Sequence, residues 1–169
     1  MHVASIVFSA LLILGVVLLL LRKRAEARRT SPTPLPPNFR VGQLWTYKTR
    51  PNETASRLTI LRIERFGKAN AVHVYVSDLS IQNPSSPTGV STFISHAPFS
   101  EAALAGSVEQ IVGKGKPPAS FDQAYAAWRK KALAKRAGLF TISVAEAIDG
   151  VERAFARAAS VPGSSRFSD

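Results

Sequence analysis

A run of 19 uncharged residues near the N-terminus, Val3 to Leu21, constrains this chain of 169 residues more than any other feature. As a helix rising about 1.5 Å per residue it would span roughly 28 Å, close to the hydrocarbon thickness of a bilayer. A helix also satisfies its own backbone hydrogen bonds, as lipid requires. A cleaved signal peptide fits less well, because only Met1 and His2 precede the run, the basic residues follow it, and Leu20 to Arg24 offers no good cleavage site. The run therefore predicts one transmembrane helix.

The charges beside this run predict its orientation. Lys and Arg next to a transmembrane helix stay on the cytoplasmic side, and here they follow the run. We expect a single-pass protein of the cell (inner) membrane, with its N-terminus outside and its C-terminal domain in the cytoplasm. The same cations would meet the anionic headgroups of the lipid bilayer. They are Arg22, Lys23, Arg24, Arg28 and Arg29.

A proline-rich segment separates the predicted anchor from a globular pattern. Residues 30–38 contain four prolines, which favour an extended polyproline II spacer of about 3.1 Å per residue. Beyond this segment, apolar residues recur with the periods of strands and helices. We expect an anchor with its basic flank (1–29), a linker (30–38), one domain (39–159) and a flexible tail (160–169).

The first half of the domain alternates apolar and polar residues with the period of β-strands. In the first strand, for example, Trp45 and Tyr47 share one face. Turn signals such as Pro51-Asn52 separate successive strands, so an antiparallel meander is expected. The predicted strands are residues 41–49, 57–66, 71–81 and 92–96.

The second half changes to helical periodicity. Ser100 can cap a helix that runs to about Val112, and residues 139–143 suggest a short strand. Two further helices begin with capping boxes, Ser120 with Gln123 and Ser143 with Glu146. Their apolar stripes are Phe121, Tyr125, Trp128 and Ala132, and Val144, Ile148, Val151 and Phe155. The sequence predicts an α+β domain, a small antiparallel sheet of four to five strands packed by three helices.

Composition excludes several kinds of function. The chain has no cysteine, so disulfides, thiolate catalysis and cysteine-ligated metals are impossible. Of the net charge of +11, the residues beside the apolar run account for +4. The remaining +7 suits anionic lipid or nucleic acid, but it is also a common means of staying soluble. We expect no cofactor and no metal ion.

Four stretches of the domain resemble a group of short bacterial proteins of uncharacterised function. They are VGQLWTYKTRP (41–51), RLTILRIE (57–64), PFSEAAL (98–104) and FTISVAEA (140–147). The likeness covers roughly residues 39–158. It implies a bacterial origin and a cytosolic fold, from which the predicted anchor is a departure. It brings no catalytic residues to this chain.

His73 and His96 are the only histidines of the predicted domain, and both lie on predicted strands. With Tyr75, and with Asp78 nearby, they are candidates for an acid–base or a metal site. Their spacing is unlike that of HExxH, in which two histidines share a helix face, so a structural, hydrogen-bonded role is the alternative. The segment Gly113-Lys114-Gly115-Lys116 resembles part of a phosphate loop, but it follows a predicted helix and is better interpreted as a helix C-cap.

A basic cluster lies on the polar side of the second predicted helix. It could contact lipid headgroups, nucleic-acid phosphates or an acidic protein. The alternative is a solvated helix face whose cations favour the C-terminal end of the dipole. No base-reading motif accompanies it, so sequence-specific nucleic-acid binding is not expected. Its members are Arg129, Lys130, Lys131, Lys135 and Arg136.

Three functions stay open. The first is a membrane-tethered protein-interaction or scaffolding module with an unidentified protein partner. The second is an enzyme on a small or lipid-linked substrate, using His73, His96 and Tyr75. The third is nonspecific binding of anionic lipid or nucleic acid through residues 129–136. The first fits best, because no catalytic or metal motif stands out in the sequence.

Overall fold

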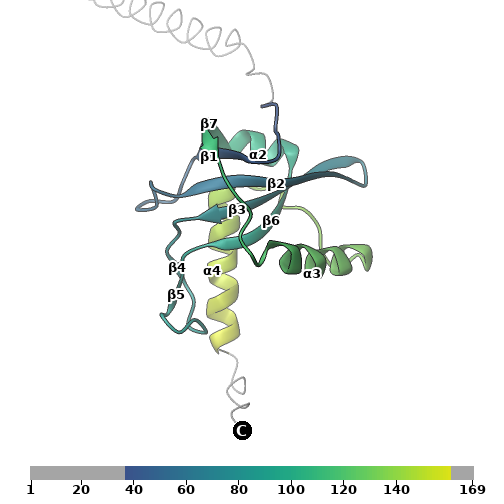
Figure 1. Ribbon diagram of the computed structural model, residues 1–169. Coiled ribbons are helices and arrows are strands. Elements are labelled where there is room, and N and C mark those ends of the chain that lie inside the picture. Colours follow the sequence, from purple (N-terminus) through teal and green to yellow (C-terminus); the bar gives the residue numbers. More distant parts are fainter. Residues whose placement is uncertain (1–36, 161–169) are drawn as a thin grey trace, which may run out of the picture. The chain divides into compact units, whose positions relative to one another are not determined.

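The residues predicted to form strands build one antiparallel sheet in the computed structural model, which describes residues 37–160 (Figure 1). The strands are β1 (Gln43–Tyr47), β2 (Arg57–Phe66), β3 (Ala69–Ser77), β4 (Ile81–Gln82), β5 (Val90–Ser91), β6 (Ile94–Ser100) and β7 (Val108–Lys114). Five of them form the sheet in the order β6-β3-β2-β1-β7, while β4 and β5 pair in a separate ribbon. The expected meander is therefore present as β1, β2 and β3, with one further strand on either side.

Helices cover both faces of this sheet. They are α2 (Glu101–Ser107), α3 (Phe121–Leu133) and α4 (Val144–Ser160). On one face, Leu104 of α2 and Ile148 of α4 join the sheet residues in one buried apolar cluster. On the other face, α3 packs its Trp128 ring against Phe66 and His73. Figure 1 shows α4 crossing the sheet and α3 lying apart from α4. The predicted α+β class, with a small antiparallel sheet and three helices, is confirmed for the domain.

Helix starts follow the predicted capping chemistry at two of three places. Ser143 and Glu146 form a reciprocal capping box: the Ser143 hydroxyl accepts from the Glu146 N–H, and the Glu146 carboxylate accepts from the Ser143 N–H. Ser100 accepts from the Ala103 N–H at 3.3 Å and so caps α2. Ser120 makes no side-chain cap, so the capping box predicted there is wrong.

The first predicted helix is too long. It ends at Ser107, and the next seven residues form β7 instead. Spacing alone suits either structure at this point, because Leu104, Val108 and Ile111 also fit a helical stripe. Pairing with β1 decides the outcome, since it gives the backbone of β7 a hydrogen-bonding partner and leaves Ile111 52% exposed.

Two smaller predictions fail with it. The Gly-Lys segment at 113–116 ends a strand rather than a helix, so the C-cap interpretation is wrong. Residues 139–143 form no strand but only a single parallel bridge between Phe140 and Phe99. That bridge holds the segment before α4 against the edge of β6, where the Phe140 N–H donates to the Pro98 carbonyl at 2.8 Å.

Between residues 37 and 160, no helix is both long and apolar enough to cross a bilayer. The predicted transmembrane helix at 3–21 and its basic flank lie outside the described residues. So do most of the linker and nearly all of the predicted tail.

Candidate functional site: a buried histidine pair beside a cavity

A register shift in β2 decides which side chains face α3. Ile60 lies opposite Val74, but Arg62 lies opposite His73, so β2 carries one extra residue between these pairs. Such a bulge reverses the alternation of a strand. Ile60 therefore faces the core under α2 and α4, whereas Glu64 faces α3 on the same side as His73. A second irregularity lies opposite, where β3 pairs with β6 next to His96.

The two histidines are in direct contact. His73 Nδ1 and His96 Nε2 are 2.8 Å apart. The rings are inclined by only 17° with centroids 5.0 Å apart, a separation close to the N–N distance plus two ring radii. The rings therefore lie edge to edge and share a proton, rather than stacking face to face. The sequence placed both on strands, and the pairing of β3 with β6 brings them together.

Glu64 anchors the other side of this pair. Its Oε1 lies 3.1 Å from His73 Nε2, although the ring N–H does not point straight at it, so the contact is chiefly electrostatic. The same carboxylate accepts from the Tyr125 hydroxyl at 3.0 Å and from Arg129 Nη1 at 3.0 Å. Three elements, β2, β3 and α3, thus converge on one carboxylate.

Aromatic side chains of α3 exclude water from His73. The Trp128 ring packs its edge against His73 at a centroid distance of 4.8 Å, and Tyr125 does so at 5.3 Å. His73 has no exposed surface. Arg62 closes the outer side by lying 4.6 Å above the Tyr125 ring, a cation–π contact.

This environment keeps both histidines neutral. Burial lowers the pKa of His96 to about 4, and the neighbouring His73 lowers it further than Glu64 raises it. Burial also lowers the pKa of His73, against the attraction of Glu64. Burial and the hydrogen bond to Glu64 raise the pKa of the Tyr125 hydroxyl. At neutral pH the network therefore has one negative group, Glu64, among neutral donors and two arginines.

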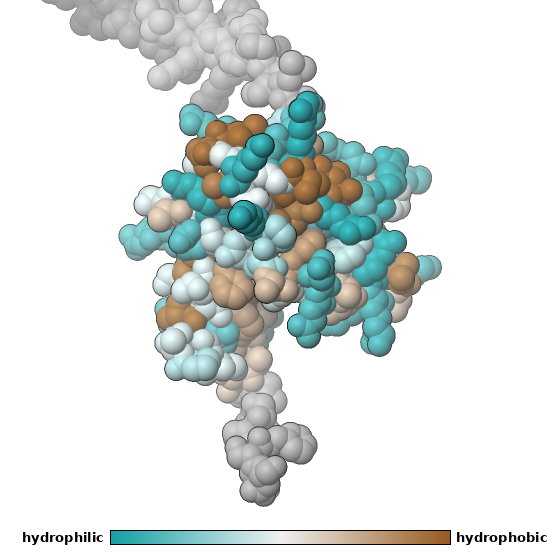
Figure 2. Space-filling model, in the orientation of Figure 1, coloured by the Kyte–Doolittle hydropathy of each residue, from teal (hydrophilic) through white to brown (hydrophobic). Residues whose placement is uncertain are grey.

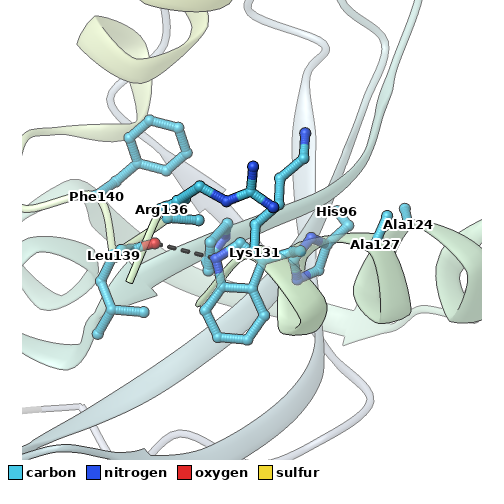
Figure 3. Close-up of a pocket in the computed structure, with 11 residues that line it drawn as sticks. His96, Ala124, Ala127, Lys131, Arg136, Leu139 and Phe140 are labelled. Carbon is cyan, nitrogen blue, oxygen red and sulfur yellow. Dashed lines mark hydrogen bonds between the residues drawn. The ribbon is translucent and has the colours of Figure 1, made fainter. Parts of the chain in front are cut away.

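An open cavity of about 580 Å³ lies next to His96. Its walls are β6, the part of α3 from Ala124 to Lys131 and the segment that follows α3 (Figure 3). The Trp128 indole N–H donates to the Gly138 carbonyl at 3.1 Å and holds that segment in place. Most of the lining residues are apolar, and the cations among them are the exposed Lys131 and Arg136. Figure 3 shows the Arg136 side chain extending toward that of Lys131.

The predicted basic cluster is divided among different environments. Arg129 pairs with Glu64, while Lys131 and Arg136 line the cavity. Lys130 and Lys135 are exposed and line no described cavity. Residues 129–136 therefore present several local surfaces rather than one face.

Tyr75 lies away from the pair. Its ring is 6.0 Å from that of Phe93, and within the described part of the chain no ring contact or hydrogen bond joins it to His73 or His96. Tyr125 occupies the position beside the histidines instead. Asp78, the other neighbour considered, accepts from the Ser77 hydroxyl in the turn after β3.

Sequence reasoning missed Glu64 and Tyr125 as site residues. Tyr125 was assigned to the core stripe of its helix, and its half-buried ring does lie on that stripe. The available signal for Glu64 was a lone carboxylate near the end of an otherwise apolar and basic strand. Without the bulge in β2, that signal would have placed it on the wrong face.

Within residues 37–160, no three His, Asp or Glu side chains are grouped as a metal site would require. Comparison with known proteins gives no assignment either: no family model, curated protein or solved structure matches this chain. The resemblance to short bacterial proteins stays a prediction.

Proposed function

We propose that this chain is a membrane-tethered binding module that takes a small ligand in the cavity beside His96. The observation that carries this proposal is the composition of the cavity wall, in which a histidine and two cations surround an apolar floor. A volume of about 580 Å³ is within the range of small-molecule sites, and such sites combine an apolar lining with a few polar groups.

Binding explains the site better than catalysis does. A general base works best when its pKa is near the operating pH, whereas burial and His73 hold the pKa of His96 at about 4. The cavity wall also contains no Ser, Thr, Cys or carboxylate that could act as a nucleophile. The pair of His73 and His96 is the best argument for the enzyme alternative. It provides neither a base whose pKa lies near neutrality nor a neighbouring nucleophile of these types.

The tether in this proposal is the 19-residue apolar run with its basic flank. A protein carrying a C-terminal tag, exposed to protease in spheroplasts, tests its orientation. We expect the tag to be protected until the cells are lysed, because the cations follow the run. Digestion in intact spheroplasts would place the domain on the outer side and reject the cytoplasmic orientation.

Trp128 offers a direct test of ligand binding. The chain has two tryptophans, and Trp45 lies in the core away from the cavity. A Trp45→Phe variant would therefore report through Trp128, which lines the site. We expect small anions to change this fluorescence, and expect Lys131→Ala to weaken the response.

Lys130→Ala is the matched control for Lys131→Ala. It removes the same charge from the neighbouring exposed position, which does not line the cavity. If both variants weaken the response equally, general electrostatics rather than the cavity would explain it. If no anion or neutral ligand changes the signal, the binding proposal fails.

A second candidate is the protein-interaction module, and the edge strand β7 favours it. β7 pairs only with β1, and it exposes Ile111 and Val112 by 52% and 48%. Figure 2 shows apolar surface in the upper part of the view, where Figure 1 places β1 and β7. Unpaired edges can accept a strand from a partner. Replacing Ile111 by Lys should remove such a partner while leaving the fluorescence response of Trp128 intact.

A further inference from the structure

The contact with Glu64 fixes which nitrogens of the histidine pair carry protons. A bare ring nitrogen beside a carboxylate would be repelled, so His73 Nε2 carries the proton that faces Glu64 Oε1. In a neutral ring the other nitrogen, Nδ1, is then an acceptor. It accepts from His96 Nε2–H across the 2.8 Å contact.

This chain of donors defines what His96 offers to the cavity. Because its Nε2 carries the proton, its Nδ1 is unprotonated and can only accept a hydrogen bond. Within the described residues that nitrogen has no hydrogen-bond partner, and it is not among the fully buried atoms without one. His96 lines the cavity together with Lys131 and Arg136, and we take its Nδ1 as the acceptor of the site.

We propose that the cavity binds a phosphate monoester as its monoanion, with the P–OH group donating to His96 Nδ1. This inference rests on the proposed binding function and names its ligand class. The other phosphate oxygens accept from Lys131 and Arg136, as anionic oxygens do from these side chains. The apolar part of the ester lies on the floor made by Trp128 and Phe140.

Other anions lack this combination of groups. A sulfate ester, a phosphodiester or a carboxylate has no O–H donor at neutral pH, so its oxygens would face the lone pair of His96. A phosphate monoester has a second pKa of about 6, and it keeps a proton on part of the population near neutrality. A site built to bind a hydroxyl strongly rejects analogues without it.

The titratable and charged groups around His96 support this preference for a protonated phosphate. They come from every element packed against it: His73 from β3, Glu64 and Arg62 from β2, Tyr125, Arg129 and Lys131 from α3, and Arg136 from the following loop. Glu64 keeps the donor direction fixed, while the arginines on its far side neutralise it. Binding should therefore strengthen as the ligand gains its proton, well above the pH at which His96 itself titrates.

Phenyl phosphate and phenyl sulfate are the probes that test this inference. They share an apolar ring and differ in the O–H donor. The full chain in a neutral detergent, with Trp45→Phe as the reporter background, is titrated with each at pH 6 and pH 8. We expect phenyl phosphate to bind about 10-fold more tightly than phenyl sulfate at pH 6. Its affinity should rise about 50-fold from pH 8 to pH 6, because the monoanion grows from about 1% to about 50% of the ester, while that of phenyl sulfate stays constant.

Two variants separate the roles of the cavity residues. His96→Leu removes the acceptor and should make the two probes bind equally. Lys131→Ala should weaken both probes by a similar factor, because both carry negative oxygens. Circular dichroism of each variant checks folding. If a variant fails to fold, the comparison of the two probes in the Trp45→Phe protein still tests the inference.

The outcomes distinguish the inference from the proposed function. Equal affinity for the two probes, with no change between pH 6 and pH 8, overturns the phosphate monoester and leaves the binding module standing. Absence of any binding overturns both. Nanodiscs with and without phosphatidic acid identify the source of the phosphate. If phosphatidic acid displaces phenyl phosphate from the cavity, the ligand is a lipid headgroup. If it does not, the ligand is a soluble ester.

Discussion

The histidine pair should make folding stability sensitive to mild acid. Folding lowers the pKa of His96 from 6.5 to about 4, first through burial and then through His73. The unfolded chain then binds more protons than the folded chain, so the free energy of unfolding decreases as the pH falls. Above the unfolded pKa of 6.5, titration of His96 does not reduce the free energy of unfolding. Between pH 6.5 and about 4 this free energy falls steadily.

The size of this effect follows from the two pKa values. At pH 5, linkage gives a loss of about 2 kcal/mol relative to pH 8. His96 is partly exposed, and solvent screening reduces the figure, so we expect about 1–2 kcal/mol. His73 adds to the loss in the same direction, because its pKa is also lowered by burial. Glu53 and Glu152, whose pKa values are lowered in the fold, lose their contributions only at lower pH.

Urea unfolding of the full chain in a neutral detergent, at pH 8 and pH 5, measures this difference. Intrinsic tryptophan fluorescence reports it, because Trp128 packs against His73. The matched variant is His96→Gln, whose amide can still donate to His73 but does not titrate. We expect the variant to lose less stability than the wild type over the same interval. The reasoning is refuted if the two proteins lose the same free energy, or if the wild type loses none.

Two further predictions concern the packing of the domain. Gly115→Ala should destabilise the fold by about 1–3 kcal/mol, because a Cβ there would come within 2.9 Å of the Thr59 side chain at three atoms. Gly106→Ala in α2, where a Cβ meets nothing within 4 Å, should be neutral or slightly stabilising. Thermal unfolding of both variants beside the wild type measures the difference. Arg50→Ala should cost about 3 kcal/mol, because it leaves the buried carboxylate of Glu53 without its bidentate partner. Arg50→Lys should recover only part of the loss, and full recovery in denaturant unfolding would contradict a role for the guanidinium geometry.

Much of the fold could be predicted from local chemistry. The bounds of β2 agree with the prediction, and the Ser143–Glu146 capping box starts α4 where the sequence placed it. Val144 and Ile148 are buried on the predicted stripe. In each case a residue's immediate neighbours along the chain decide the structure, through side-chain period or a short-range hydrogen bond.

Residues 108–114 show where local chemistry is insufficient. They suit a helix or a strand, and pairing with β1, some 60 residues earlier, decides for the strand. The candidate site depends even more on tertiary structure. The sequence alone identified His73 and His96 as candidates, but it contained no sign that they touch.

Only the tertiary structure decided how that pair is completed. A single extra residue in β2 turns Glu64 from the core face to the α3 face. There it meets His73 and Tyr125, which lie 9 and 61 positions further along the chain. Strand periodicity predicts the face of a side chain only while the register is continuous, and a bulge depends on pairing between strands rather than on the strand's own sequence.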